Sequence, residues 1–167
     1  MTELIAAGLK LVSENDVYDH EGQPSVKFMH GGTLKRLSSS SAARAVETAN
    51  KFIKDEHRTA VLAPQYSAAV KTLCDLALGG KGSGSHAAAQ VLLSCWNGDN
   101  YHLNATGLGN LDAEYFEAAL MVLRGRVQVW EEPQNVIEGG DDIFDKLVRE
   151  WGHLRTDRRY SDLYEQD

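Results

Sequence analysis

The chain has 167 residues, of which 43% are hydrophobic and 25% are charged, a composition typical of one folded domain of about 150 residues. Its net charge of −7 disfavours general binding of the phosphate backbone, because that affinity comes from basic side chains. No apolar run approaches the roughly 20 residues of a membrane helix, and Glu3 stands where a secretory signal would carry a basic residue. We therefore expect a cytoplasmic protein that binds no membrane.

The first third of the sequence predicts a short helix and then a small antiparallel sheet. Thr2 is a suitable N-cap for a helix that ends near Val12. Apolar residues then alternate with polar ones at 17–18 and 25–29, which is the period of a strand. Gly31-Gly32 supplies the positive φ angles of a tight hairpin turn. We therefore expect two or three antiparallel strands in this part of the chain.

From Ser38 onward, apolar residues recur at helical spacing. The pattern predicts helices over residues 42–57, 65–78, 84–96, 113–130 and 142–151. Between the first two, residues 59–63 are predicted to form a strand or a linker that ends at Pro64. The fourth helix has the clearest pattern, with Asp112 as its N-cap and seven apolar residues expected to face the core. These seven are Tyr115, Phe116, Ala119, Leu120, Leu123, Val127 and Trp130.

Together these elements predict an α+β fold that is mainly α, with a small N-terminal antiparallel β element followed by a bundle of about five helices. The change of pattern along the chain predicts three parts. These are a mixed α/β part over 1–63, a helical domain over 64–154 and a charged tail over 155–167. Cys74 and Cys95 are predicted to be buried, unpaired thiols, because their expected offset of roughly 10 Å along two neighbouring helices is beyond disulfide reach.

No motif in the sequence indicates catalysis, so we predict no catalytic residue, no metal ion and no cofactor. The glycine-rich stretch 79–85 follows a helix, and its lysine is misplaced for a phosphate-binding loop. The six histidines and two cysteines lack the spacing of a zinc site. Two alternatives stay open. One is a site assembled from Asp19, His20 and His57, and the other is a divalent cation held by the paired carboxylates near the C-terminal end.

Charge is distributed unevenly along the chain. Residues 27–58 carry seven basic and three acidic groups, whereas residues 131–150 carry seven acidic and two basic groups. This separation predicts two candidate binding regions. The first, called the basic set below, consists of Lys27, Lys35, Arg36, Arg44 and Lys51. The second, called the acidic segment, consists of Glu131, Glu132, Glu138, Asp141 and Asp142.

Several motifs in the second half of the chain carry a family resemblance. They are Leu73-Cys74-Asp75-Leu76-Ala77, residues 88–93 with Cys95-Trp96-Asn97, Leu111-Asp112 and the stretch from Phe144 to Trp151. Through them, residues 66–154 resemble a helical domain family encoded on integrative and conjugative elements of proteobacteria. That family commonly carries a second tryptophan where Cys95 stands here. The resemblance implies a helical fold and an origin in a mobile element, whose small accessory proteins often regulate transfer or counter host defences.

Two functions of different class follow from the sequence. The favoured one is a non-enzymatic cytoplasmic accessory protein that binds a protein partner, such as a nucleic-acid-binding complex, through the acidic segment. It would then regulate that partner or inhibit a host defence system in the manner of an anti-CRISPR protein. The alternative is a nucleic-acid-binding protein or small hydrolase that uses the basic N-terminal third. Direct binding of nucleic acid is the less favoured of the two, and the oligomeric state stays open.

Overall fold

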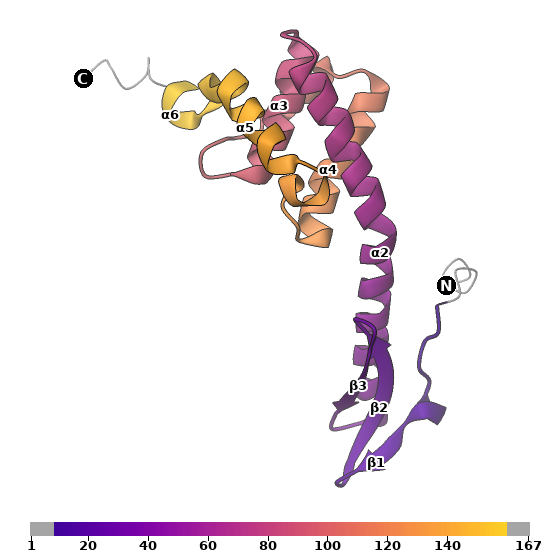
Figure 1. Ribbon diagram of the computed structural model, residues 1–167. Coiled ribbons are helices and arrows are strands. Elements are labelled where there is room, and N and C mark those ends of the chain that lie inside the picture. The colour runs from indigo at the N-terminus through magenta and orange to yellow at the C-terminus, as the bar shows by residue number, and fades with distance from the viewer. Residues whose placement is uncertain (1–8, 160–167) are drawn as a thin grey trace. The chain divides into compact units, whose positions relative to one another are not determined.

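The computed structural model describes residues 9–159 of the chain (Figure 1). The fold is α+β and mainly α, as predicted, with a three-stranded antiparallel sheet followed by helices. The chain divides into two compact units. Unit 1 comprises Met1–Val61 and unit 2 comprises Leu62–Asp167. Helix α2, Ala42–Leu78, contributes its first turns to unit 1 and its later turns to unit 2.

The sheet of unit 1 has the strand order β1-β2-β3, and both neighbouring pairs are antiparallel. The strands are β1 Tyr18–His20, β2 Gln23–His30 and β3 Thr33–Ser38. The predicted glycine hairpin is confirmed, since Gly31 and Gly32 both have positive φ, 59° and 68°. The turn before it is formed by Glu21 and Gly22, so Pro24 lies inside β2, where it faces Asp19.

One face of this sheet packs on the first half of α2. Val26 and Phe28 are two residues apart on β2, so both side chains point to the same face. They form a core with Ala45, Ala49 and Ile53, which recur at helical spacing on α2. Among the described residues of unit 1, no helix covers the opposite face of the sheet, where Lys27 and Arg36 are exposed and Ser25 is buried.

The predicted helix over 2–12 is wrong where the structure describes it, and residues 2–8 lie outside the described part of the chain. Leu9–Val12 is not helical. The reason is a side chain on α2: Asn50 accepts a hydrogen bond from the Val12 amide at 2.9 Å and donates one to the Val12 carbonyl at 2.8 Å. These two bonds satisfy backbone groups that a helix would otherwise pair internally.

The predicted break at residues 59–63 is also wrong, because α2 continues through it as one helix of 37 residues. Pro64 lies in its interior and removes one helical hydrogen bond, which commonly costs about 3 kcal/mol. Burial on both sides of the proline offsets that cost, since Ile53 and Leu62 before it and Tyr66 after it are buried. Tertiary packing therefore overrides the local helix-breaking tendency.

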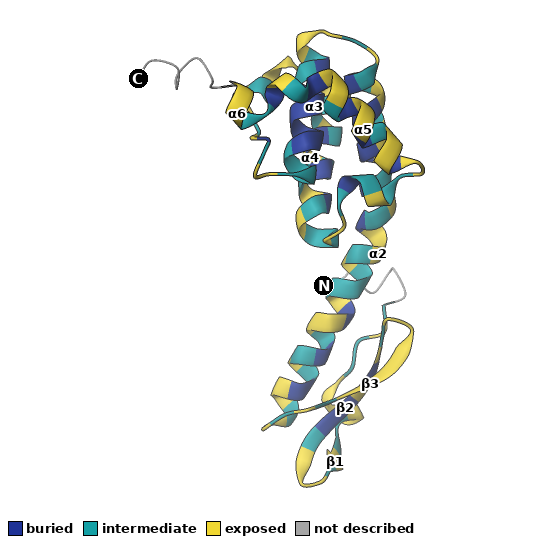
Figure 2. Cartoon of the chain, turned by 60° about the vertical axis from the view of Figure 1, so that its left-hand side comes forward, coloured by how far each residue is buried: buried dark blue, intermediate teal, exposed yellow. Residues whose placement is uncertain are grey.

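Unit 2 is a helical bundle around α3, the most completely buried helix of the unit (Figure 2). Residues 87–93 of α3 are buried on every side, which is the pattern of a central helix. Around it lie α4, α5, the second half of α2 and several short 3-10 turns. The bounds are α3 Ser83–Trp96, η2 Ala105–Asn110, α4 Ala113–Val129, η3 Pro133–Val136, α5 Gly140–Trp151, η4 Gly152–Leu154 and α6 Thr156–Arg159.

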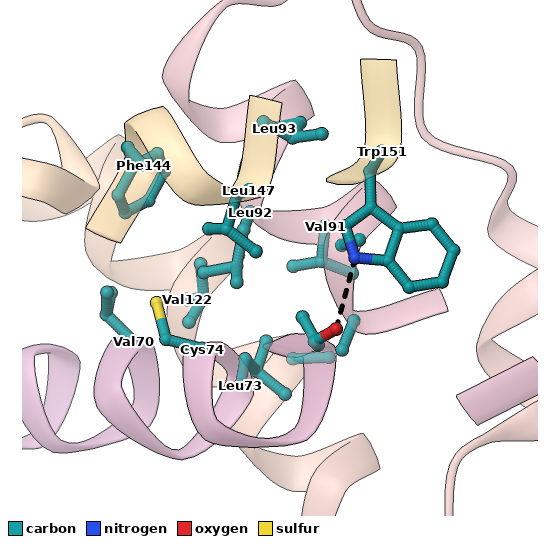
Figure 3. Packing of buried hydrophobic residues seen from close by; sticks show 14 of the residues in the cluster. Val70, Leu73, Cys74, Val91, Leu92, Leu93, Val122, Phe144, Leu147 and Trp151 are labelled. Carbon is teal, nitrogen blue, oxygen red and sulfur yellow. Dashed lines mark hydrogen bonds between the residues drawn. The ribbon is translucent and has the colours of Figure 1, made fainter. Parts of the chain in front are cut away.

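Large aliphatic and aromatic side chains from all four longer helices meet in the core of unit 2 (Figure 3). Leu73 and Cys74 come from α2, and Phe144 and Leu147 come from α5 as predicted. Trp151, at the end of α5, is buried and donates its indole N–H to the Ala77 carbonyl at 3.1 Å. Both cysteines are free thiols, as predicted, although only Cys74 is fully buried.

Tyr66 links α2 closely to α4. Its ring lies directly against Gly125, where a Cβ atom would overlap the ring carbons. Its hydroxyl donates a hydrogen bond to the Glu131 carbonyl at 3.1 Å, just beyond the end of α4. Burial raises the pKa of this phenol well above its ordinary value, so the hydroxyl keeps the proton that it donates. A glycine is therefore required at this crossing.

The beginning of the predicted charged tail, residues 155–159, forms defined structure. Arg155 forms an ion pair with Asp157 at 3.0 Å and a β-bridge with Tyr101. Thr156–Arg159 then form the short helix α6. The ion pair neutralises part of the charge that, in the sequence alone, suggests a solvent-exposed segment. Residues 160–167 of the predicted tail lie outside the described part of the chain.

The crossing at Gly125 yields a first prediction. Replacing Gly125 by Ala should lower the free energy of unfolding by about 1 to 3 kcal/mol, because the added methyl group must displace the Tyr66 ring. Chemical denaturation measures the change. Gly109→Ala is the matched control, since no atom lies within 4 Å of its Cβ position. Equal stability of the Gly125→Ala and Gly109→Ala variants would contradict the close approach.

The buried thiol yields a second prediction, on pH. Burial raises the pKa of Cys74 from 9.0 to about 12. The unfolded chain therefore loses this proton near pH 9 while the folded chain keeps it. Between about pH 9 and 12 the free energy of unfolding should fall by about 1.4 kcal/mol per pH unit from this group, and below pH 9 the thiol should contribute no slope.

Cys74→Ala tests this assignment, because it removes one titrating group. Below pH 9 its cavity lowers stability, and above pH 9 the slope should become shallower than in the wild-type chain, so the difference between the two proteins shrinks as pH rises. Denaturation curves collected across this pH range measure both slopes. Parallel pH profiles for the two proteins would show that Cys74 is not protonated in the folded state at these pH values.

Candidate functional site

Two members of the basic set come together on the uncovered face of the sheet. Lys27 on β2 and Arg36 on β3 are direct partners in the antiparallel register, so their side chains point to the same face. Both are exposed. Their face is opposite to Val26 and Phe28, which are buried against α2. We call this surface the open sheet face, and the exposed residues of β3 can be followed in Figure 2.

Aromatic side chains from β1 join the same face. Tyr18 faces Ser25 in the register, and Ser25 is two residues from Lys27, so all three share one side of the sheet. The Lys27 ammonium lies over the Tyr18 ring, 5.0 Å from its centroid, which is a cation–π contact. The Tyr18 and His20 rings are 6.4 Å apart. The open sheet face therefore combines two cations with two neighbouring rings.

The other three members of the basic set lie elsewhere. Lys35 pairs with Phe28, so its position belongs to the side of the sheet that faces α2. Arg44 and Lys51 line a shallow hollow along α2, together with acidic residues such as Glu47. Four basic residues line that hollow against Glu47 and Asp55, so the two carboxylates offset only part of its positive charge. The basic set is thus divided among three places, and of its members Lys27 and Arg36 are the pair that lies beside aromatic rings.

The acidic segment surrounds the connection between α4 and α5. Glu131 and Glu138 are exposed, and Asp141 and Asp142 occupy the first turn of α5, where a carboxylate stabilises the helix dipole. The predicted start of this helix at residue 142 is two residues late. Its N-cap is Gly139 with φ 65°, and Gly140 lies too close to the Gln134 backbone to carry a side chain.

Glu132 is the one member of the acidic segment that is bonded within its own loop. Its carboxylate accepts a hydrogen bond from the Gln134 side chain at 2.6 Å. None of the five carboxylates forms an ion pair with a residue of the described chain. The segment is therefore a largely uncompensated negative surface.

The predicted inward stripe of α4 is wrong for three of its seven members, although Tyr115, Ala119 and Leu123 do contact the core. The side of α4 that is buried carries small residues, Ala119 and Gly125, together with Val122. By contrast, the exposed fraction is 41% for Leu120, 68% for Val127 and 81% for Trp130. Small residues face the core because they allow the Tyr66 ring and α3 to approach closely. Asp112 stands at the predicted N-cap position, but its side chain makes no capping hydrogen bond.

The described residues contain no group of three His, Cys, Asp or Glu side chains that could hold a metal ion. Neither thiol is an activated nucleophile, since burial raises the pKa of Cys95 to about 11 and that of Cys74 to about 12. Sequence reasoning missed the rings of Tyr18 and His20 and the exposure of the α4 stripe.

Within residues 9–159, no helix combines the length and hydrophobicity that a bilayer crossing requires. Neither a curated protein nor a solved structure matches the chain significantly. One family model does match, over residues 67–152, which is slightly more than half of the chain and lies within unit 2. The match covers α3, α4 and α5 and leaves out the sheet. The chain therefore belongs to the family of unknown function DUF7673.

Proposed function

We propose that this protein is a non-enzymatic binding protein whose unit 1 binds nucleic acid through the open sheet face. The observation that carries the proposal is the cross-strand pair of Lys27 and Arg36 beside the Tyr18 ring. Lysine and arginine bind phosphate, and a neighbouring aromatic ring offers a base a surface on which to stack. This combination distinguishes the open sheet face from the mixed-charge hollow on α2.

Charge along the chain supports this assignment to unit 1. Residues 1–63 carry eight basic and eight acidic groups, so the whole net charge of −7 belongs to residues 64–167. The acidic balance of the protein is therefore a property of unit 2. Contacts with phosphate depend more on the charged side chains near the site than on the net charge of the whole chain, since salt screens charges beyond about 10 Å.

The size of the site indicates modest affinity. Two phosphate contacts release few counterions, so binding by one copy should be weak and should fall as salt rises. Stacking of a base on an aromatic side chain contributes about 1 to 3 kcal/mol. The open sheet face therefore suits a protein that binds nucleic acid as part of a larger assembly, rather than a tight stand-alone repressor.

Reversing both cations tests the proposal. The double variant Lys27→Glu, Arg36→Glu should lose at least about tenfold in affinity at low salt, and the slope of log affinity against log salt should shrink by about 2. Fluorescence anisotropy with labelled single-stranded DNA, duplex DNA and single-stranded RNA measures both quantities. The comparison also identifies which nucleic acid is preferred.

The matched control is the double variant Arg44→Glu, Lys51→Glu, which changes the net charge equally at the hollow on α2. We expect it to retain most of the affinity. Equal losses in the two double variants would reject a specific site on the sheet. Absence of binding by the wild-type protein to all three nucleic acids at low salt would reject the function itself.

A second candidate function uses the acidic segment, because its carboxylates are mostly exposed and form no ion pair within the described chain. Such a surface complements a basic protein, and complementary charge mainly accelerates and orients association. A nucleic-acid-binding complex has the required basic surface. This candidate would give the protein the cytoplasmic role that the mobile-element resemblance implies, as a regulator of transfer or an inhibitor of a host defence system.

Charge reversal separates this candidate from the first. The variant with Glu131, Glu132, Asp141 and Asp142 changed to Lys should no longer capture its partner from a lysate of the native host, while its helical circular dichroism stays unchanged. A control with Glu14, Glu21, Glu47 and Asp99 changed to Lys alters the net charge equally at exposed positions elsewhere. Capture that survives in the first variant contradicts a role for the acidic segment.

A further inference from the structure

Helix α4 presents a continuous apolar stripe on the side that does not face the core. The stripe consists of Phe116, Leu120, Leu123, Val127 and the C-cap residue Trp130. The intervals along the chain are four, three, four and three residues, which is the spacing by which one helix packs along another. Leu123 touches the core at its margin, but Leu120, Val127 and Trp130 are among the exposed large hydrophobic residues of the protein.

A hollow of about 440 Å³ runs beside this stripe. Leu123, Val127 and Trp130 form one wall, and Trp96 and Leu103 belong to the other side. Trp130 also has a left-handed backbone with φ 68°, a conformation that bulky residues rarely adopt. An exposed tryptophan in a strained position is typical of binding surfaces, where tryptophan is strongly enriched among the residues that dominate affinity.

We propose that this stripe is a homodimer interface, in which α4 of two copies pack antiparallel around a two-fold axis. In an antiparallel pair the two helices run in opposite directions, so the numbers of facing residues add up to a constant. In the register that aligns the two stripes, Leu120 contacts Leu123 of the second copy. In the same register, Phe116 contacts Val127 of the second copy. All five stripe residues are covered, and the surface is complementary to itself, as a two-fold interface requires.

The charged residues beside the stripe favour a second copy of this chain as the partner, and they favour the antiparallel orientation. Glu117 and Arg124 are exposed and seven residues apart, so both flank the same side of the stripe. In the antiparallel pair Glu117 lies beside Arg124 of the second copy, and the two-fold axis repeats this attraction. A parallel pair would instead bring Asp112 beside Glu117 of the second copy, which places like charges together twice. A second copy of this chain therefore supplies both the apolar and the charged complement.

Sedimentation of the full-length chain at increasing concentration tests the dimer. The wild-type protein should show a concentration-dependent dimer, and Leu120→Glu should be a monomer with unchanged helical content. Leu34→Glu is the matched control, because Leu34 is 64% exposed on the sheet of unit 1. It should dimerise like the wild type. A wild-type protein that is monomeric at every concentration overturns the proposal, as does a dimer that persists in Leu120→Glu.

Charge reversal at the flank tests the orientation. Glu117→Arg and Arg124→Glu should each raise the dimer dissociation constant by about tenfold, because each replaces two attractive contacts with two repulsive ones. An equimolar mixture of the two variants should form a heterodimer with near wild-type affinity, since every contact across the interface then joins opposite charges. A mixture that dimerises no better than the separate variants overturns the antiparallel pairing.

Discussion

The fold depends on one helix that buries two different apolar surfaces along its length. In unit 1, Ala45 and Ile53 of α2 cover the sheet, and in unit 2, Tyr66 and Leu73 enter the helical core. The apolar face of the three-stranded sheet is buried against α2, which removes Val26 and Phe28 from water. The helix in turn tolerates Pro64 because buried residues hold it on both sides. Each core therefore requires the helix, and the helix requires both cores.

The sequence predicts the sheet and part of the candidate site because a two-residue glycine turn fixes the register of its hairpin. With Gly31 and Gly32 at the tip, paired residues have numbers that sum to a constant, and Lys27 must face Arg36. The same rule places Lys35 opposite Phe28. The position of Tyr18 was harder to predict, since it depends on the turn between β1 and β2. That turn has Glu21 at positive φ, where a residue such as Asn or Gly is expected.

The orientation of α4 could not be predicted, because its sequence contains two surfaces that both fit a helical period. One carries Leu120, Val127 and Trp130, and the other carries Ala119, Val122 and Gly125. Hydrophobic periodicity favours the larger residues for the core. The structure buries the smaller ones, because the ring of Tyr66 from a distant part of the chain occupies the space that a larger side chain would need. Only that long-range contact decides between the two surfaces.

The two proposed surfaces support each other although they lie in different units. A single open sheet face has two cations and two rings, and one copy would bind nucleic acid weakly in a chain with a net charge of −7. Pairing of two chains through α4 places two such faces on one particle. If one nucleic acid reaches both faces, the second contact would be made at a high effective concentration, which would raise the overall affinity without any new residue at the site. Dimerisation through unit 2 is thus a physical route by which an acidic protein with a small basic site could bind nucleic acid firmly.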